Sequence, residues 1–256
     1  QINVVGSHIS YCQQGGIVSR GGEVRNLQVG TCDIEGNMSA ENKPTANILL
    51  DSTEGSIAEV AITGCSIQHE SPSPDSANIR LIGRGVGGLK NVPGATQEGH
   101  VTICGNVFSD VKVNVDIQHS RGVILTGNTF WMGYEYNLRV TDSQQIVVGS
   151  NVFERNPRYD YGTAATTKNI LLFRDCQDCT LNGLHVQGTK GEVGLTIENC
   201  RRFNIASCTI LDCAGTALLL KNVEECRLHG CLIRNDVDKT AKLLSVVGGK
   251  NNKIEE

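Results

Sequence analysis

The chain has 256 residues, a formal net charge of −4 and only eleven aromatic residues. Its 23 Lys and Arg residues form no stripe, which argues against nucleic acid as a partner, because proteins that bind nucleic acid gather positive charge on one face. No apolar stretch approaches the roughly 20 residues that a membrane-spanning helix needs, so we expect no membrane span.

From the N-terminus onward, one short pattern recurs nine times around a corner residue. The corners are Ser7, Cys32, Cys65, Asn106, Asn128, Asn151, Leu184, Cys208 and Cys231. Three residues before every corner and two residues after it, the side chain is apolar, as in Val4 and Ile9 around Ser7. Apolar residues at steps of two predict strands with one buried face, and the recurrence every 22 to 41 residues predicts units that stack.

A third apolar pair lies farther upstream of the later corners. It reads Val115/Ile117, Leu138/Val140, Leu171/Phe173, Leu195/Ile197 and Leu218/Leu220. We therefore predict an all-β solenoid with three short strands per rung and about nine to ten rungs, forming one domain over residues 1–256. Ile2 already fits a core position, and Lys253-Ile254 opens an unfinished repeat. Because a solenoid needs polar caps, we expect a piece of a longer protein without its two end caps.

This repeat pattern resembles that of the right-handed parallel β-helix, or pectate-lyase-like, superfamily. Asn106, Asn128 and Asn151 match the superfamily's stacked-asparagine corner, and G-N-x-F occurs at 105–108 and 127–130. The resemblance implies a carbohydrate-active protein with a polysaccharide or oligosaccharide as its partner. By the same analogy we expect an extracellular or periplasmic location. The oligomeric state stays open.

Eleven cysteines raise the question of disulfides or metal. Most of them occupy inward positions of the repeat, so we expect them to act as small apolar core residues. The odd count and the absence of a paired framework argue against a disulfide-rich secreted protein. The C-x-x-C at Cys176 and Cys179 lacks a second pair for zinc, and His8 belongs to no visible constellation. We therefore expect no metal site.

Insertions mark one side of the solenoid. Segments 35–46, 69–77 and 154–168 precede the third strand of their rungs, and 84–99 follows it. Long insertions in a solenoid mark the binding face, so we expect function on the outward face of the third strand. An asparagine column is expected to face outward there. It comprises Asn47, Asn78, Asn114 and Asn137.

Arg80, Asp116 and Arg139 share another outward column on this face. An arginine guanidinium can form two parallel hydrogen bonds to a carboxylate, and Asn both donates and accepts hydrogen bonds. This surface therefore suits a carboxylated or heavily hydroxylated polymer. The alternative is a purely structural ladder of ion pairs. Both interpretations remain open at this point.

Aromatic residues gather beside this column. Trp131, Tyr134, Tyr136, Tyr159 and Tyr161 fall in two neighbouring connections, near charged residues such as Glu135, Arg155, Arg158 and Asp160. Tyr and Trp rings bury a large apolar surface while their O–H or N–H group still forms hydrogen bonds, so we predict that they stack on sugar rings. The alternative is that they cover the end of the core under a long loop.

In the superfamily that the chain resembles, polysaccharide lyases use an Arg or Lys base, often with calcium held by carboxylates, and hydrolases use clustered Asp residues. The resemblance implies a lyase acting on a uronate-containing polymer, with Arg139 as base or carboxylate clamp, Asp116 as its partner and Arg80 as a second clamp. Calcium is weakly supported, since the column holds a single carboxylate and this ion takes six to eight oxygens.

The candidate substrate-binding residues are Trp131, Tyr134, Glu135, Asn137, Asn114, Arg158, Tyr159, Asp160 and Tyr161. A glycoside hydrolase on the same scaffold is an alternative and would rest on Glu135 and Asp160. A non-catalytic rod that binds carbohydrate or serves only as a surface structure is another.

Overall fold

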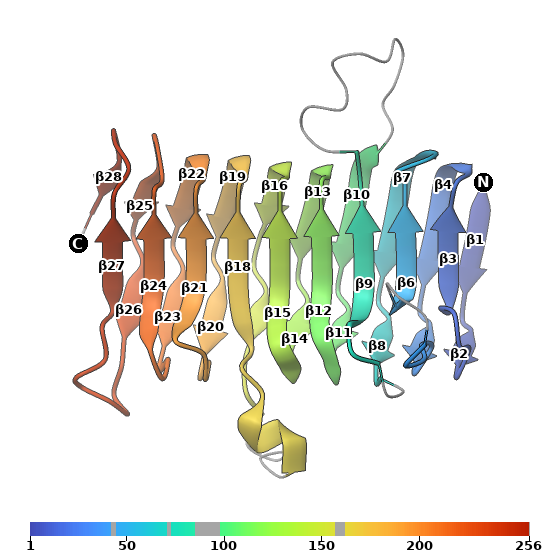
Figure 1. Ribbon diagram of the computed structural model, residues 1–256, viewed down its shortest axis with the longest axis horizontal. Helices are drawn as coiled ribbons and strands as arrows, with labels where there is room; N and C mark the ends of the chain where they lie inside the picture. Colours follow the sequence, from blue (N-terminus) through green and yellow to red (C-terminus); the bar gives the residue numbers. More distant parts are fainter. Residues whose placement is uncertain (42–44, 71–72, 85–97, 157–161, 256) are drawn as a thin grey trace.

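Short parallel strands make up most of the chain. The computed structural model describes residues 1–41, 45–70, 73–84, 98–156 and 162–255. In these residues the strands form three sheets that run along one axis, with the termini at opposite ends (Figure 1).

Each sheet takes one strand from almost every rung. Sheet A consists of β1 (Ile2–Val5), β4 (Glu23–Gly30), β7 (Ser56–Thr63), β10 (Glu98–Cys104), β13 (Arg121–Thr126), β16 (Gln144–Val148), β19 (Gln177–Asn182), β22 (Arg201–Ala206), β25 (Arg227–His229) and β28 (Lys253–Ile254). Sheet B consists of β2 (His8–Ser10), β5 (Asp33–Glu35), β8 (Ser66–Gln68), β11 (Val107–Phe108), β14 (Thr129–Phe130), β17 (Val152–Phe153), β20 (His185–Gln187), β23 (Thr209–Leu211) and β26 (Leu232–Arg234). Sheet C consists of β3 (Ile17–Arg20), β6 (Thr45–Asp51), β9 (Ser76–Ile82), β12 (Val111–Gln118), β15 (Gly133–Thr141), β18 (Ile170–Arg174), β21 (Val193–Glu198), β24 (Thr216–Lys221) and β27 (Leu244–Val247).

The register of the sheets confirms the predicted columns. Val101 pairs with Val123 in sheet A, and Phe108 pairs with Phe130 in sheet B. Every such pairing is parallel and joins equivalent positions of neighbouring rungs. Because crossovers between parallel strands are right-handed, the chain is a right-handed parallel β-helix with three strands per rung, as predicted.

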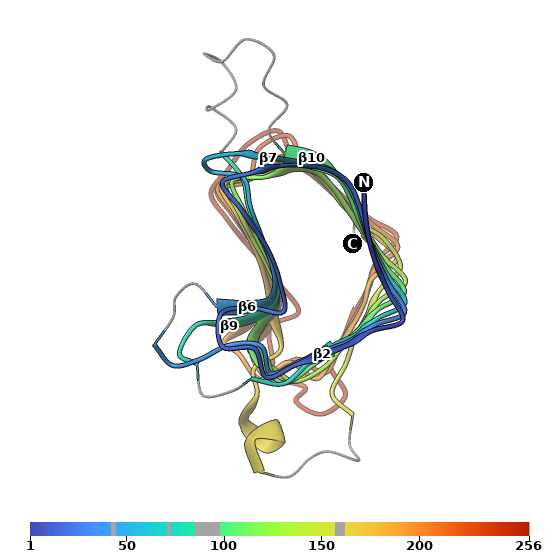
Figure 2. The same cartoon turned by 90° about the vertical axis from the view of Figure 1, so that its right-hand side faces the viewer.

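The core fills the space between the three sheets (Figure 2). Phe108, Phe130 and Phe153 stack on successive rungs with ring centroids 4.8 and 4.5 Å apart. Most of the cysteines are also buried, which confirms their predicted place in the core. Cys179 is 1% exposed, and burial raises the pKa of its thiol to about 12.

A ladder of asparagines holds the corner between sheets A and B. The side-chain oxygen of Asn128 accepts hydrogen bonds from the amide and the side chain of Asn106 at 2.9 and 3.0 Å. Its side-chain nitrogen donates to the Ile103 carbonyl at 3.0 Å and to Asn151 at 2.9 Å. Each asparagine therefore ties its rung to both neighbours, and the predicted stacked-asparagine corner is confirmed.

The predicted insertions connect sheet B to sheet C, or sheet C to sheet A. The short helix η3 (Gly162–Thr166) lies in one of them, between β17 and β18, and projects from the corner between sheets B and C (Figure 2). In the described part of the chain, no helix has the length and apolar character needed to cross a membrane.

Replacing Asn128 with Ala tests the ladder. We expect the free energy of unfolding to fall by about 3–5 kcal/mol, because each buried group left without a partner costs about 1–3 kcal/mol. Asn182, exposed at the end of β19, is the matched control, and Asn182→Ala should shift stability by at most about 0.5 kcal/mol. Urea denaturation followed by circular dichroism measures both. Equal effects of the two variants would contradict the proposed role of the ladder.

Candidate functional site

The predicted outward column lies on sheet C. Arg80 in β9 pairs with Asp116 in β12, which pairs with Arg139 in β15. The column continues to Leu49 on one side and to Leu172 on the other. The three charged residues are therefore stacked at rung spacing, as the sequence predicted.

Asp116 is the centre of this group and is fully buried. Its carboxylate accepts hydrogen bonds from Arg80 Nε at 2.9 Å and from Arg139 Nε and Nη2 at 2.9 and 2.8 Å. Gln118 Nε2 adds a fourth at 2.8 Å. The two arginines thus share one carboxylate, and the bond to Arg139 is bidentate, which is the strongest geometry for this pair.

Charge and burial act in opposite directions on the pKa of Asp116. Burial raises it, but the hydrogen bonds and charges of Arg139 and Arg80 outweigh burial and lower it below the ordinary value. The same hydrogen bonds raise the pKa of Arg139 against its own burial. Asp116 is therefore an anion and Arg139 a cation across the physiological range.

The structure does not leave Arg80 on an open surface. Its side chain is 1% exposed, and it donates to the Thr45 carbonyl at 3.0 Å and to the Asp75 carbonyl at 3.1 Å. Both carbonyls lie near the ends of the inserted segments before β6 and β9. The insertions therefore cover Arg80 instead of standing beside it, and the expectation of an exposed second clamp is wrong.

The asparagine column was also expected to face outward, and this is wrong. Asn114 and Asn137 are fully buried, and Asn114 Nδ2 donates to Asn137 Oδ1 at 2.8 Å. Asn47 and Asn78 continue the same ladder. Their side-chain nitrogens also donate to carbonyls just after sheet B strands, as Asn78 does to Ser109 and Asn114 to Trp131, so these side chains lie in the bend between sheets B and C. Neither Asn114 nor Asn137 is exposed, so neither can contact a polymer.

Arg139 is the member of the column that reaches solvent, with 23% of its side chain exposed. Its guanidinium carbon lies 5.5 Å from the centre of the Tyr136 ring, within the range of a cation–π contact. Lys112 and Glu135 form an ion pair at 3.6 Å on adjacent strands of the same sheet. The exposed part of this face is therefore small and carries charges of both signs.

The aromatic residues differ in part from the prediction. Trp131 follows β14 directly, whereas Tyr134 and Tyr136 belong to β15, so the expected loop is mostly strand. All three are half-buried. The other predicted members lie outside the described residues. These are Arg158, Tyr159, Asp160 and Tyr161.

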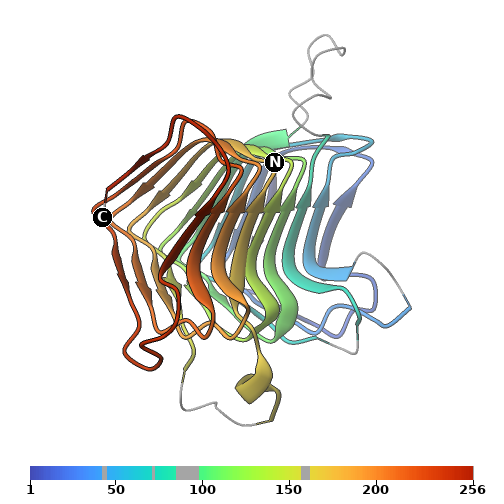
Figure 3. The same cartoon turned by 60° about the vertical axis from the view of Figure 1, so that its left-hand side comes forward.

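Arg155 supports the inserted segment after β17. It donates to the carbonyls of Ala164 and Thr167 and, at 3.2 Å, to that of Gly188. An open cleft lies beside it, lined by residues at or after the ends of β17, β20, β23 and β26. η3 and the β26–β27 connection project from one edge of the solenoid (Figures 1 and 3). This cleft was not predicted from the sequence.

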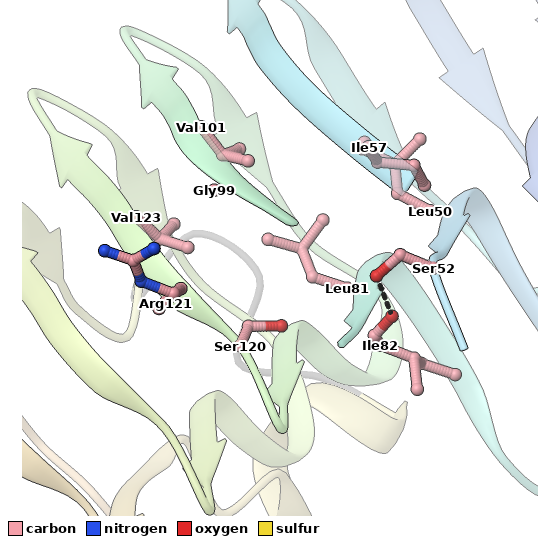
Figure 4. Close-up of a pocket in the computed structure, with 10 residues that line it drawn as sticks. All are labelled: Leu50, Ser52, Ile57, Leu81, Ile82, Gly99, Val101, Ser120, Arg121 and Val123. Carbon is pink, nitrogen blue, oxygen red and sulfur yellow. Dashed lines mark hydrogen bonds between the residues drawn. The ribbon is translucent and has the colours of Figure 1, made fainter. Parts of the chain in front are cut away.

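A smaller hollow lies inside the solenoid (Figure 4). Mostly apolar side chains line it, among them Leu50, Leu81 and Val101 from sheets A and C. It is a gap in core packing rather than a site on the predicted face.

Comparison with known proteins identifies a family. A family model described as "Periplasmic copper-binding protein (NosD)" matches residues 81–255, which is more than half of the chain. The chain belongs to the NosD family. A search of the curated proteins finds no match.

Solved structures resemble the chain in fold. Tailspike protein 2 from Escherichia coli O157:H7 bacteriophage CAB120 shares 10% identity at a TM-score of 0.57, over 97% of this chain and 38% of the tailspike. The enzymatically active domain of the bacteriophage CBA120 tailspike protein 2 shares 11% identity at a TM-score of 0.53, over 98% of this chain and 42% of the domain. The chain thus spans less than half of either. The A-module of mannuronan C-5 epimerase AlgE4 from Azotobacter vinelandii shares 12% identity at a TM-score of 0.44, over 98% of this chain and 87% of the module. This likeness is weaker than that of the tailspikes and carries no argument.

The described residues of the matched segment do not present a cluster of copper ligands of the His, Cys, Asp or Glu types. Copper takes Cys, Met and His ligands, and Cys ligands bind as thiolates. In the described part of residues 81–255, no three His, Cys, Asp or Glu ligand atoms lie within 4.8 Å of one another. The buried thiols donate to backbone carbonyls, as Cys200 does to Glu198, and burial raises the pKa of Cys208 to about 11. These thiols therefore remain protonated.

Acidification tests the role of Asp116. Its pKa is lowered by folding, so its contribution is complete above the unfolded value of about 3.9 and is lost as pH falls through the folded value. Asp116→Asn should lower the unfolding free energy at pH 7 by about 3–5 kcal/mol, because it leaves buried Arg80 uncompensated. The difference in unfolding free energy between Asp116→Asn and the parent chain should become smaller below about pH 4.

Urea denaturation at pH 7 and pH 3.5 measures this difference. Asp178→Asn is the control, since Asp178 also pairs with an arginine, Arg202, but at the surface. It should change stability much less. A gap between Asp116→Asn and the parent that is the same at both pH values would contradict the assignment.

Proposed function

We propose that the chain binds a uronate-containing polysaccharide on the outward face of sheet C, with Arg139 holding a carboxylate of the polymer. The observation that carries this proposal is a partly exposed guanidinium fixed from two sides. Asp116 holds Arg139 by two hydrogen bonds at 2.9 and 2.8 Å, and the Tyr136 ring lies 5.5 Å from its carbon. A fixed guanidinium loses little conformational entropy when it binds a ligand.

The chemistry of this face supports an acidic sugar. An arginine has five N–H donors, and Asp116 takes two of those of Arg139, so donors remain for a ligand carboxylate. Trp131 and Tyr134 belong to the same rung and supply flat rings of the kind that stack on sugars. Lys112 and Glu135 add groups that pair with hydroxyls or carboxylates.

Binding is supported better than catalysis by Arg139. A general base must lose its proton readily near the operating pH, whereas the pKa of Arg139 is raised. Asp116 is ionised and holds four donors, so it cannot serve as a general acid. Cleavage by β-elimination, the reaction implied by the resemblance to lyases, would need a proton acceptor outside this trio. We therefore assign Arg139 as a clamp.

Arg139→Gln tests the clamp. It should weaken binding of oligouronates roughly 10- to 100-fold, since a hydrogen bond to a charged group contributes about 1.5–3 kcal/mol. Arg174→Gln is the matched control, because Arg174 lies one strand away in sheet C, also pairs with a carboxylate, Glu198, and is about half exposed. It should bind like the parent. Titration calorimetry against uronate and neutral oligosaccharides measures both, and Arg139→Lys separates lost charge from lost fork geometry.

Two results would contradict the proposal. Parent-like uronate binding by folded Arg139→Gln would remove Arg139 from the site. A rise in the absorbance of unsaturated uronate products that requires Arg139 would make it a catalytic residue instead of a clamp.

A further inference from the structure

We propose that the first two rungs carry a site for a divalent transition metal, formed by His8, Asp33 and Glu35 on the outward face of sheet B. His8 Nε2 lies 3.4 Å from Glu35 Oε1 and 3.8 Å from Asp33 Oδ2. One ligand atom from each residue lies within 4.8 Å of the other two. In the described residues, no other group of three such side chains comes this close.

The sheet register brings these residues together. His8 in β2 pairs with Asp33 in β5, and Ser10 pairs with Glu35. Side chains two residues apart on a strand share a face, so Asp33 and Glu35 project on the same side, and His8 projects beside them from the next rung. The three donors are therefore placed by backbone pairing, before any ion binds.

The separations suit a small divalent ion. Zinc binds imidazole nitrogen and carboxylate oxygen at about 2.0–2.2 Å, which puts two tetrahedral ligands about 3.4 Å apart. The separations of 3.4 and 3.8 Å require only a small rotation of His8, whose side chain is 60% exposed. One imidazole nitrogen and two carboxylates are a ligand set between hard and soft. This set suits Zn²⁺ and not Ca²⁺, which takes six to eight oxygens.

Neighbouring groups hold Glu35 in place. Its second oxygen, Oε2, lies 3.1 Å from His69 Nδ1 and accepts a hydrogen bond from Gln68 Nε2 at 3.4 Å. The Gly36 amide bonds to the carbonyls of Gln68 and His69 at 3.1 and 3.0 Å, which fixes this strand end against β5. Residues that orient a ligand in this way are characteristic of metal sites.

The cluster has an excess of negative charge. In the described residues, the ion-pair partners of Asp33 and Glu35 are histidines only, and no Lys or Arg pairs with them. The Oδ1 atom of Asp33 is buried and has no hydrogen-bond partner there. A bound cation would offset the negative charge of the two carboxylates, and the Asp33 side chain, 45% exposed, is open to its approach.

The site is independent of both assignments above. His8, Asp33 and Glu35 lie outside the segment 81–255 that the family model matches. They are also on sheet B, whereas the proposed polysaccharide face is on sheet C. His185 offers a natural comparison, because it holds the position of His8 in a later rung, but its strand neighbours are Val152 and Thr209.

Titration calorimetry with Zn²⁺ on the chelator-treated full chain tests the site. Cys12→Ser is used as background, since Cys12 is an exposed thiol. We expect one ion per chain, and a loss of affinity of at least about 100-fold in His8→Ala or Glu35→Gln. His69→Asn should cost roughly 10–100-fold, as for residues that orient a ligand. His185→Ala should bind Zn²⁺ like the background chain, and Ca²⁺ should not compete.

Thermal melting checks the folding of each variant. Zn²⁺ should raise the melting temperature of the background chain and leave that of His8→Ala unchanged, while both melt alike without metal. Failure of the background chain to bind Zn²⁺ would overturn the site and leave His8 as an ordinary ion-pair partner. Binding that survives in His8→Ala but disappears on thiol alkylation would also overturn it, by placing the ion on cysteines.

Discussion

Hydrogen bonding between successive rungs is the constraint on which this molecule depends. Parallel pairing sets each residue directly over its counterpart, as Val101 over Val123. Each side chain in a column must therefore pack against an identical side chain or against one that complements its charge or hydrogen bonding. Asparagine meets this demand because its amide both donates and accepts, so Asn106 and Asn128 continue one ladder, while Phe108 and Phe130 stack as rings.

Charged residues in a column obey the same constraint by alternating in sign. Asp116 lies between Arg80 and Arg139, and both ion pairs have short hydrogen-bonded contacts. The insertions before β6 and β9 cover one end of this column and leave the other partly open. One column therefore supports the fold at Arg80 and leaves the Arg139 guanidinium held by Asp116 and partly exposed.

Membership of the NosD family and the likeness to tailspikes do not by themselves assign chemistry to this chain. A β-helix is a scaffold on which unrelated sites are placed, so the sites must be argued from their side chains. The two proposed here use different faces and different donors. Arg139 suits an anionic ligand, whereas His8, Asp33 and Glu35 suit a cation.

The rungs, the three sheets and most of the core could be predicted from the sequence alone, because a strict period leaves its apolar columns visible in one chain. It also aligned Arg80, Asp116 and Arg139 correctly. Which of them reach solvent could not be predicted, because the covering segments belong to other rungs and follow no period. Asn114 turns into the bend between sheets B and C, where it donates to the Trp131 carbonyl, and the two-residue alternation does not encode that bend. The His8 cluster stayed hidden because its ligands come from two columns, which meet only when neighbouring rungs pack.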